Sequence, residues 1–223
     1  MRSISLTLLV FLLGSAISSA QTGSVAPSAA ALSSLEKISP DSIPLVEESV
    51  VDLRPWLPPP GEQKMNDCTA WAIAYVGKTY LEARDQGWRY PRTPDRIFSP
   101  RFVYNQINQG KDEGSVFIDA IRLMHEKGAA TLATAPYRPG DFLGAPSPAA
   151  LEEAKLYPVQ DGRLLRSGKD IRRALQRRQI VIFGAHVNPT FFSGKFSPYT
   201  TELFRKGSQP ASRQACHGDR RLR

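Results

Sequence analysis

The feature that most constrains this chain is an abrupt change at Asp67, where proline-rich sequence gives way to a helical pattern. The prolines in "VVDLRPWLPPPGEQ" force extended or turn backbone, because proline fixes φ and lacks an N–H. From Cys68 to Arg84, small and apolar residues then recur with a period near 3.6, at Ala70, Ile73, Ala74, Gly77, Tyr80 and Leu81. The pattern predicts a long helix that Cys68 opens, with Asp67 or Asn66 as its N-cap.

The sequence after this helix predicts three more helices and one strand. "SPRFVYNQIN" is typical of a short helix capped by Ser99, with Pro100 at its first position. "GSVFIDAIRLMHEKG" predicts a helix capped by Ser115 and ended by Gly128, and "SGKDIRRALQRRQ" predicts another. "LATAPYRPGDF" indicates a loop, and the β-branched run "IVIFGAHV" indicates a strand. Helices first and a strand later predict an α+β fold with a helical half followed by a sheet half.

The first 20 residues are typical of a secretory signal peptide. Arg2 gives the positive charge, residues 6–13 the apolar core, and Ser18-Ser19-Ala20 a small-residue cleavage site. A retained membrane anchor is the alternative, although the apolar run is shorter than the roughly 20 residues of a membrane span. Residues 21–48 are rich in Ala, Ser and Pro and indicate a linker or the remnant of a pro-segment. We therefore predict an exported protein, periplasmic or secreted, whose folded domain covers residues 49–209.

The distribution of the basic residues argues against a nucleic-acid-binding protein. The chain has 29 basic and 21 acidic residues, a net charge of +8. Several basic residues stand in the last eleven positions, and others lie in "KDIRRALQRRQ", where a solvated helix face explains them. Proteins that bind nucleic acid interleave aromatic residues with basic ones, and neither segment does so. An exported protein could also hold a disulfide, for which Cys68 and Cys216 are the two cysteines available.

A cysteine in the first turn of a helix is placed to act as a nucleophile. The positive end of the helix dipole and the unpaired backbone N–H groups there favour a thiolate. The N–H of Cys68 could also bind a developing oxyanion, and the side-chain amide of Gln63 could donate a second hydrogen bond. The alternative is a small buried cysteine with a packing role alone. Spacing by itself leaves both open.

The stretch "VDLRPWLPPPGEQKMNDCTAWAIAY" resembles the start of a mature papain-like cysteine peptidase in its bacterial form. In that family an extended D-x-R segment leads to a glutamine, and the catalytic cysteine then opens the central helix with a tryptophan nearby. The matching residues are Asp52, Arg54, Gln63, Cys68 and Trp71. The family glutamine usually stands six residues before the cysteine, whereas Gln63 stands five before it.

The resemblance continues through "FSPRFVYNQIN" and "DEGSVFIDAIRLMHEKGAATLATAPY" and covers roughly residues 52–192. It implies a papain-like fold with an incomplete sheet half, and a thiol protease that hydrolyses peptide bonds through Cys68, with Gln63 in the oxyanion hole. It also implies that the backbone at Gly114 and Ser115 pairs with an extended peptide or protein substrate. No cofactor, no metal, no nucleic acid and, after signal removal, no membrane partner is expected.

The histidine that such a peptidase needs as its base has no clear place in this chain. The family supplies it in a strand with the pattern HAM-x-x-V-G-Y-D, followed by an asparagine in an N-S-W-G segment. His125 lies within a predicted helix, His186 on the predicted strand before the family position, and His217 in "ASRQACHGDRRLR". None of these segments has the family pattern, so we predict a chain that is inactive as written.

A reading-frame shift explains residues 210–223. With suitable codons for "QACHGDRRLR", removing one nucleotide after the Gln214 codon gives "QHAMAIVGY" followed by Asp or Glu, which is the family's histidine strand. We therefore predict an out-of-frame tail, with a naturally short basic tail as the alternative. Two other functions also stay open. One is a non-catalytic papain-fold binding or scaffold protein, and the other is a redox or structural thiol protein that pairs Cys68 with Cys216.

Overall fold

The computed structural model describes residues 7–12, 23–34 and 50–185. The chain divides into two compact units, and all of the helices and strands below belong to the unit made of residues 1–12 and 21–184. The predicted tail at 210–223, His186, Cys216 and His217 lie outside the described residues, so the predictions made for them are not tested.

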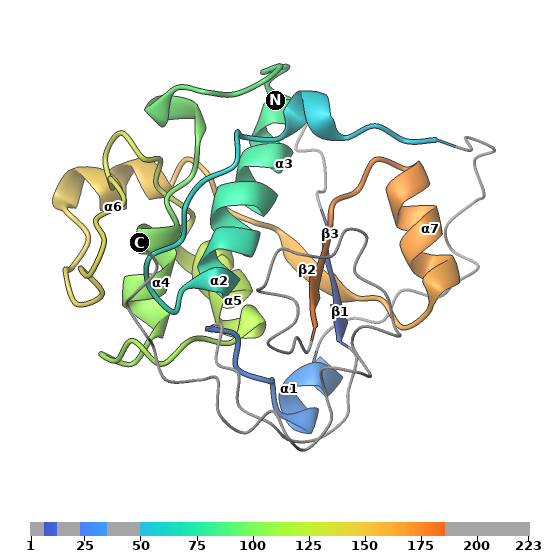
Figure 1. The fold of residues 1–223 in the computed structure, drawn as a ribbon, viewed down its shortest axis with the longest axis horizontal. Coiled ribbons are helices and arrows are strands. Elements are labelled where there is room, and N and C mark those ends of the chain that lie inside the picture. Colours follow the sequence, from blue (N-terminus) through green and yellow to red (C-terminus); the bar gives the residue numbers. More distant parts are fainter. Residues whose placement is uncertain (1–6, 13–22, 35–49, 186–223) are drawn as a thin grey trace, which may run out of the picture. The chain divides into compact units, whose positions relative to one another are not determined.

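A helical run from Cys68 to Asp85 forms the centre of this unit, as the sequence predicts. It consists of α2 (Cys68–Ala70), the π-helix η3 (Trp71–Lys78) and α3 (Thr79–Asp85), which follow one another without a break (Figure 1). Most of its side chains are buried, including polar ones, which is typical of a helix covered on several sides. The short 3₁₀ helix η2 (Arg54–Trp56) lies in the proline-rich segment before it.

Helices α4 (Pro100–Ile107) and α5 (Phe117–Lys127) pack against this run and against each other. The Ser99 hydroxyl caps α4 by accepting a hydrogen bond from the Phe102 N–H at 3.2 Å, as predicted. Gly128 ends α5 with a φ of +80°. The predicted cap of α5 by Ser115 is wrong: Val116 holds the N-cap position, and no side chain caps the helix.

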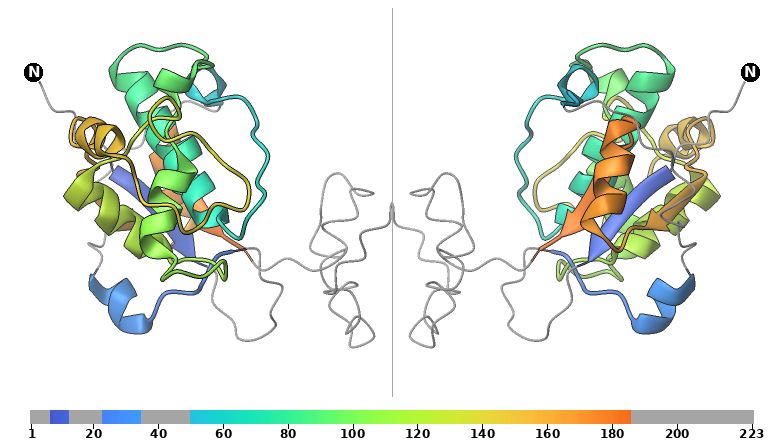
Figure 2. Two further views of the ribbon diagram at one scale, coloured as in Figure 1. Left: turned by 90° about the vertical axis from the view of Figure 1, so that its left-hand side faces the viewer. Right: turned by 90° about the vertical axis from the view of Figure 1, so that its right-hand side faces the viewer.

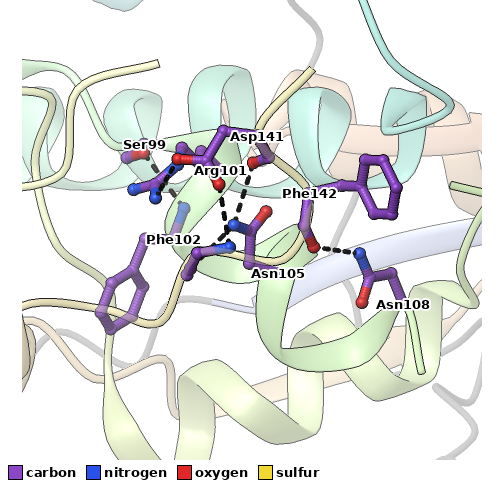
Figure 3. Close-up of polar contacts among 8 residues, drawn as sticks. Ser99, Arg101, Phe102, Asn105, Asn108, Asp141 and Phe142 are labelled. Atoms are coloured by element: carbon purple, nitrogen blue, oxygen red, sulfur yellow. Dashed lines mark hydrogen bonds and ion pairs between the residues drawn. The ribbon is translucent and has the colours of Figure 1, made fainter. Parts of the chain in front are cut away.

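A helix that the sequence analysis did not predict, α6 (Pro148–Ala154), follows the loop after α5. Side chains of α4 and of Asn108, the residue after it, hold that loop in place, as Figure 3 shows. The Arg101 guanidinium lies 2.5 Å from the Asp141 carboxylate, Asn105 donates to the Asp141 carbonyl at 3.0 Å, and Asn108 donates to the Phe142 carbonyl at 2.7 Å. The loop predicted from "LATAPYRPGDF" is confirmed, and these bonds give it a fixed course.

Three short parallel strands form the sheet. They are β1 (Thr7–Leu12), β2 (Asp161–Leu164) and β3 (Val181–Gly184), in the order β2-β1-β3. Helix α7 (Gly168–Gln176), capped by Ser167, connects β2 to β3. Figures 1 and 2 show α7 on one side of the strands and α4 and α5 on the other. The described part of the chain is mostly helical with few strands, which is consistent with the predicted α+β fold.

The N-terminal segment contains two elements that the sequence analysis did not predict. Residues 7–12, expected within the apolar core of a signal peptide, form the central strand, in which Thr7 aligns with Asp161 and Leu9 with Val181. The helix α1 (Ala29–Ser34) lies in the segment predicted as a linker. Removal of residues 1–20 by a signal peptidase stays a prediction. Within the described ranges, no helix is both long and apolar enough to cross a bilayer.

Candidate active site

Cys68 stands at the first position of the central helical run, half-buried, as the sequence predicts. The Asp67 carbonyl accepts the first helical hydrogen bond, from the Trp71 N–H at 3.0 Å. Asp67 thus occupies the N-cap position, as predicted, but its carboxylate does not bind the N–H groups of the first turn. The positive end of the helix is therefore next to the thiol and is not neutralised by a capping side chain.

Two tyrosine hydroxyls hold the loop before Cys68, one from the central helical run and one from the loop before α6. Tyr75 donates to the Pro59 carbonyl at 3.0 Å, and the Lys64 N–H donates to the Tyr137 hydroxyl at 3.0 Å. Gln63, predicted as the oxyanion donor, uses its side-chain amide to donate to the Met65 carbonyl at 2.7 Å. Its amide is therefore engaged within its own loop, and the oxyanion role of Gln63 stays a prediction.

An aromatic cluster underlies that loop. The Trp71 ring lies 4.5 Å from the ring of Tyr75 and 5.0 Å from that of Tyr137, centroid to centroid. Gly61 passes directly over the Trp71 indole, since a Cβ at Gly61 would lie 2.3 Å from it. The tryptophan that accompanies Cys68 in the sequence thus supports the loop that carries Gln63.

A second set of bonds fixes the loop at 112–115 beside Cys68. The Asn66 N–H donates to the Asp112 carboxylate at 2.8 Å, and the Asn66 amide donates to the Asp112 carbonyl at 2.7 Å. Tyr104, on α4, donates its hydroxyl to the same carboxylate at 2.8 Å. Burial and this bond raise the pKa of the Tyr104 phenol above its usual value, so it stays a donor. The sequence analysis missed these residues, because isolated polar and aromatic residues carry no periodic signal.

The backbone of Ser115 pairs with an extended segment of the same chain. Its N–H donates to the Gly23 carbonyl at 2.9 Å, and its carbonyl accepts from the Val25 N–H at 2.9 Å, which makes a parallel bridge between Ser24 and Ser115. The hydroxyl of Thr69, next to Cys68, donates to the Ser115 carbonyl at 3.1 Å. The segment therefore lies beside the start of the helix that carries the thiol.

Two glycines permit this close approach. Gly23 has a φ of +86°, and a Cβ there would lie 2.1 Å from the Asn66 carbonyl oxygen. Gly114 has a φ of +101°, and a Cβ there would lie 2.8 Å from the Gly23 carbonyl oxygen. Any larger residue would push the two backbones apart, so both positions depend on glycine.

Asp67 is the most unusual ionisable group of the site. Its side chain is fully buried, and burial raises its pKa to about 6. The Tyr137 hydroxyl and the Trp71 indole favour the ionised form in part, while the charge of Asp112 opposes it. By contrast, the pKa of the exposed Asp52 falls to about 2, because Arg54 binds its carboxylate.

The histidine within the described ranges, His125, does not belong to this site. It lies near the C-terminal end of α5, whereas Ser115 precedes the N-terminal end. The His125 side chain is exposed, as predicted, and its Nδ1 lies 3.0 Å from the Val159 carbonyl oxygen. The structure thus places Gly114 and Ser115 beside the residues that flank Cys68, whereas the side chain of Gln63 bonds within its own loop, and no imidazole of the described residues belongs to this group.

Comparison with solved structures gives a structural likeness. The structure is similar to the crystal structure of xylellain, a cysteine protease from Xylella fastidiosa, with a TM-score of 0.45 and 19% sequence identity. The match covers 73% of this chain and 61% of that chain, so this chain spans less than two thirds of its length. No protein-family model and no curated protein matches the sequence.

Proposed function

We propose that this chain derives from a cysteine peptidase that hydrolyses peptide bonds with Cys68 as its nucleophile. The observation that carries the proposal is the pairing of Ser115 with residues 23–25. Through two backbone hydrogen bonds, this site holds an extended peptide segment beside the first turn of the helix that Cys68 opens. A peptidase needs this combination of a peptide-binding backbone edge and a nucleophile at one place.

In the proposed reaction, the Cys68 thiolate attacks the carbonyl carbon of a bound peptide and forms a thioester while the amine leaves. Water then hydrolyses the thioester, which releases the acid and restores the thiol. The backbone N–H of Cys68 is the nearest donor for the oxyanion, and Gln63 would serve as a second donor once its amide turns away from Met65. Protonation of the leaving amine needs an acid, for which we propose the histidine of the frame-shifted strand.

A non-catalytic peptide-binding protein is the second candidate. The engagement of Gln63 with Met65 and the presence of residues 23–25 at Ser115 favour it, because both leave the site unready for chemistry. We further propose export to a periplasm or to the outside of the cell, which follows from the signal-like first 20 residues.

Three genes compared side by side test the proposal. They encode the chain as written, the chain with one nucleotide removed after the Gln214 codon, and the latter with Cys68→Ala. We expect negligible peptide hydrolysis from the first, hydrolysis and labelling by a thiol-directed peptidase inhibitor from the second, and neither from the third. Loss of one member of a catalytic set costs roughly 10⁴ to 10⁶ in turnover. A restored chain that folds but does not cleave peptides would favour the binding protein.

A further inference from the structure

The carboxyl group of Asp67 is buried directly before the candidate nucleophile without a structural task that explains it. Its side chain is 0% exposed and does not cap the helix. Among the described residues, neither carboxylate oxygen accepts a hydrogen bond of normal geometry, although the Tyr137 hydroxyl and the Trp71 indole lie close enough to favour its ionised form. A buried carboxyl usually has such partners, because burial without them is unfavourable.

The groups around Asp67 come from several elements, and the charged one among them is negative. Tyr137, from the loop before α6, and Trp71, one turn along the helix, lie nearest to the carboxyl group, while Asp112 acts on it as a like charge. Tyr104, on α4, donates a hydrogen bond to Asp112, and the charge of Asp67 contributes to the raised pKa of the Tyr104 phenol. The side chain of Lys64 is partly exposed and pairs with Glu62. Within the described part of the chain, no cation is therefore among the groups that shift the ionisation of Asp67.

Asp67 and Cys68 compete for one source of stabilisation. The positive end of the helix dipole favours a negative charge in the first turn, and both the carboxylate and the thiolate would lie there. Two negative charges on successive residues repel each other, so ionisation of one makes ionisation of the other less favourable. Such a pair loses its two protons in coupled steps.

We propose that Asp67 is a charge-setting residue for Cys68: its neutral form permits the thiolate, and its ionised form suppresses it. At neutral pH the ionised Asp67 would then hold the pKa of the Cys68 thiol higher than a neutral side chain at that position would. Asp67 acts through Cys68 and does not touch the substrate, so it is a positioning residue. The importance of this control for catalysis rests on the proposed function, but its effect on thiol chemistry does not.

The test measures the reactivity of Cys68 toward iodoacetamide as a function of pH. Cys216→Ser is introduced first, so that Cys68 is the sole cysteine of the chain. In this background, Asp67→Asn removes the charge and keeps the shape of the side chain. Asp119→Asn, on α5, is the matched control, because Asp119 is partly exposed and pairs with Arg122.

We expect Asp67→Asn to lower the pH of half-maximal alkylation by about one unit and to raise the rate near neutral pH about tenfold, because a like charge is lost. The Asp119→Asn profile should overlay that of the parent. A profile of Asp67→Asn that overlays the parent, or that moves to higher pH, would overturn the proposal. Peptide hydrolysis is not measured, so an absence of peptidase activity cannot produce either result.

A second measurement covers the case in which Asp67→Asn does not fold. The ultraviolet absorbance of the thiolate is followed in the Cys216→Ser chain with Asp67 intact. The ionised Asp67 should hold the midpoint of this titration above that of the same chain unfolded in urea, where both side chains are solvated. A midpoint at or below that of the unfolded chain would contradict the proposal.

Discussion

At the scale of single residues, Gly23 decides whether its segment can lie against Ser115. We expect Gly23→Ala to displace the segment, because the new Cβ would meet the Asn66 carbonyl and the residue would keep an unfavourable positive φ. The Ser115 and Val25 amides would then exchange with solvent at least about tenfold faster, measured by hydrogen–deuterium exchange. Gly87→Ala is the control, since Gly87 also has a positive φ but no atom within 4 Å of its Cβ position. Unchanged protection in Gly23→Ala would contradict the pairing.

Asp67 also predicts how stability depends on pH. Its pKa in the folded protein, about 6, is above the value of an unfolded aspartate, so the folded state holds this proton more tightly. The stabilisation is complete below about pH 4 and is lost as the pH rises to about 6, with a change of about 2 kcal/mol in the free energy of unfolding.

Urea unfolding at several pH values measures this change in the free energy of unfolding. In Asp67→Asn that contribution should vanish, because the amide does not titrate. If both proteins keep the same slope between pH 4 and 6, the carboxyl group does not titrate there in the folded state.

At the scale of elements, the central helical run holds a buried ion pair. The Lys78 ammonium lies 2.5 Å from the Glu82 carboxylate and donates to the Pro158 carbonyl at 2.8 Å. Burial lowers the pKa of Lys78, and Glu82 opposes this shift. We expect Glu82→Gln to lower the free energy of unfolding by about 3 kcal/mol, because it leaves a buried charge without its counter-ion.

The matched variant for this pair is the double substitution Lys78→Met with Glu82→Gln. It removes both charges and keeps comparable volume, so it should be more stable than Glu82→Gln alone. Urea unfolding of the two proteins and the parent gives the comparison. Equal losses in the single and double variants would mean that volume, and not charge, accounts for the effect.

Local signals predicted the helices well where a cap and a period agree. Ser99, Ser167 and Gly128 mark helix ends in the sequence and in the structure. The serine before a proline that begins α4 recurs at Ser147 and Pro148. That signal predicts a helix start there, and α6 begins at Pro148. By contrast, "DGRL" in β2 has no strand pattern, and its strand conformation comes from pairing with β1. Pairing of this kind depends on distant residues, which no local window contains.

In the candidate site, too, some features follow from local sequence signals and others depend on distant residues. The place of Cys68 in its helix follows from the break at Asp67. Ser115 accepts a bond from Thr69, next to Cys68, and the binding of substrate at Gly114 and Ser115 stays a prediction. The segment at residues 23–25 was not predicted to lie there, because its bonds join residues far apart in the chain. The burial of Asp67 also depends on Tyr137, which folds back from a distant loop.

At the scale of the whole molecule, the sheet depends on the first residues of the chain. β1 pairs with β2 on one side and β3 on the other, so the two outer strands do not pair with each other. Removing residues 1–20 would leave both strands with an unpaired edge. We expect this shortened chain to unfold at a lower urea concentration than the full chain. Removal of residues 1–6 alone is the control and should change little, whereas an unchanged midpoint in the first deletion would show that β1 adds no stability.

The position of β1 has a consequence for the order of events during synthesis. Thr7 is made about 150 residues before its partner Asp161, and contacts of such long sequence separation form late in folding. At roughly 5 to 20 residues per second, the ribosome needs several seconds or more to cover that distance. If the segment is also an export signal, a secretion apparatus has that interval in which to engage it before β2 and β3 exist. Chains that the apparatus binds within that interval would be exported unfolded. In chains that it meets later, the signal would already be paired with β2 and β3.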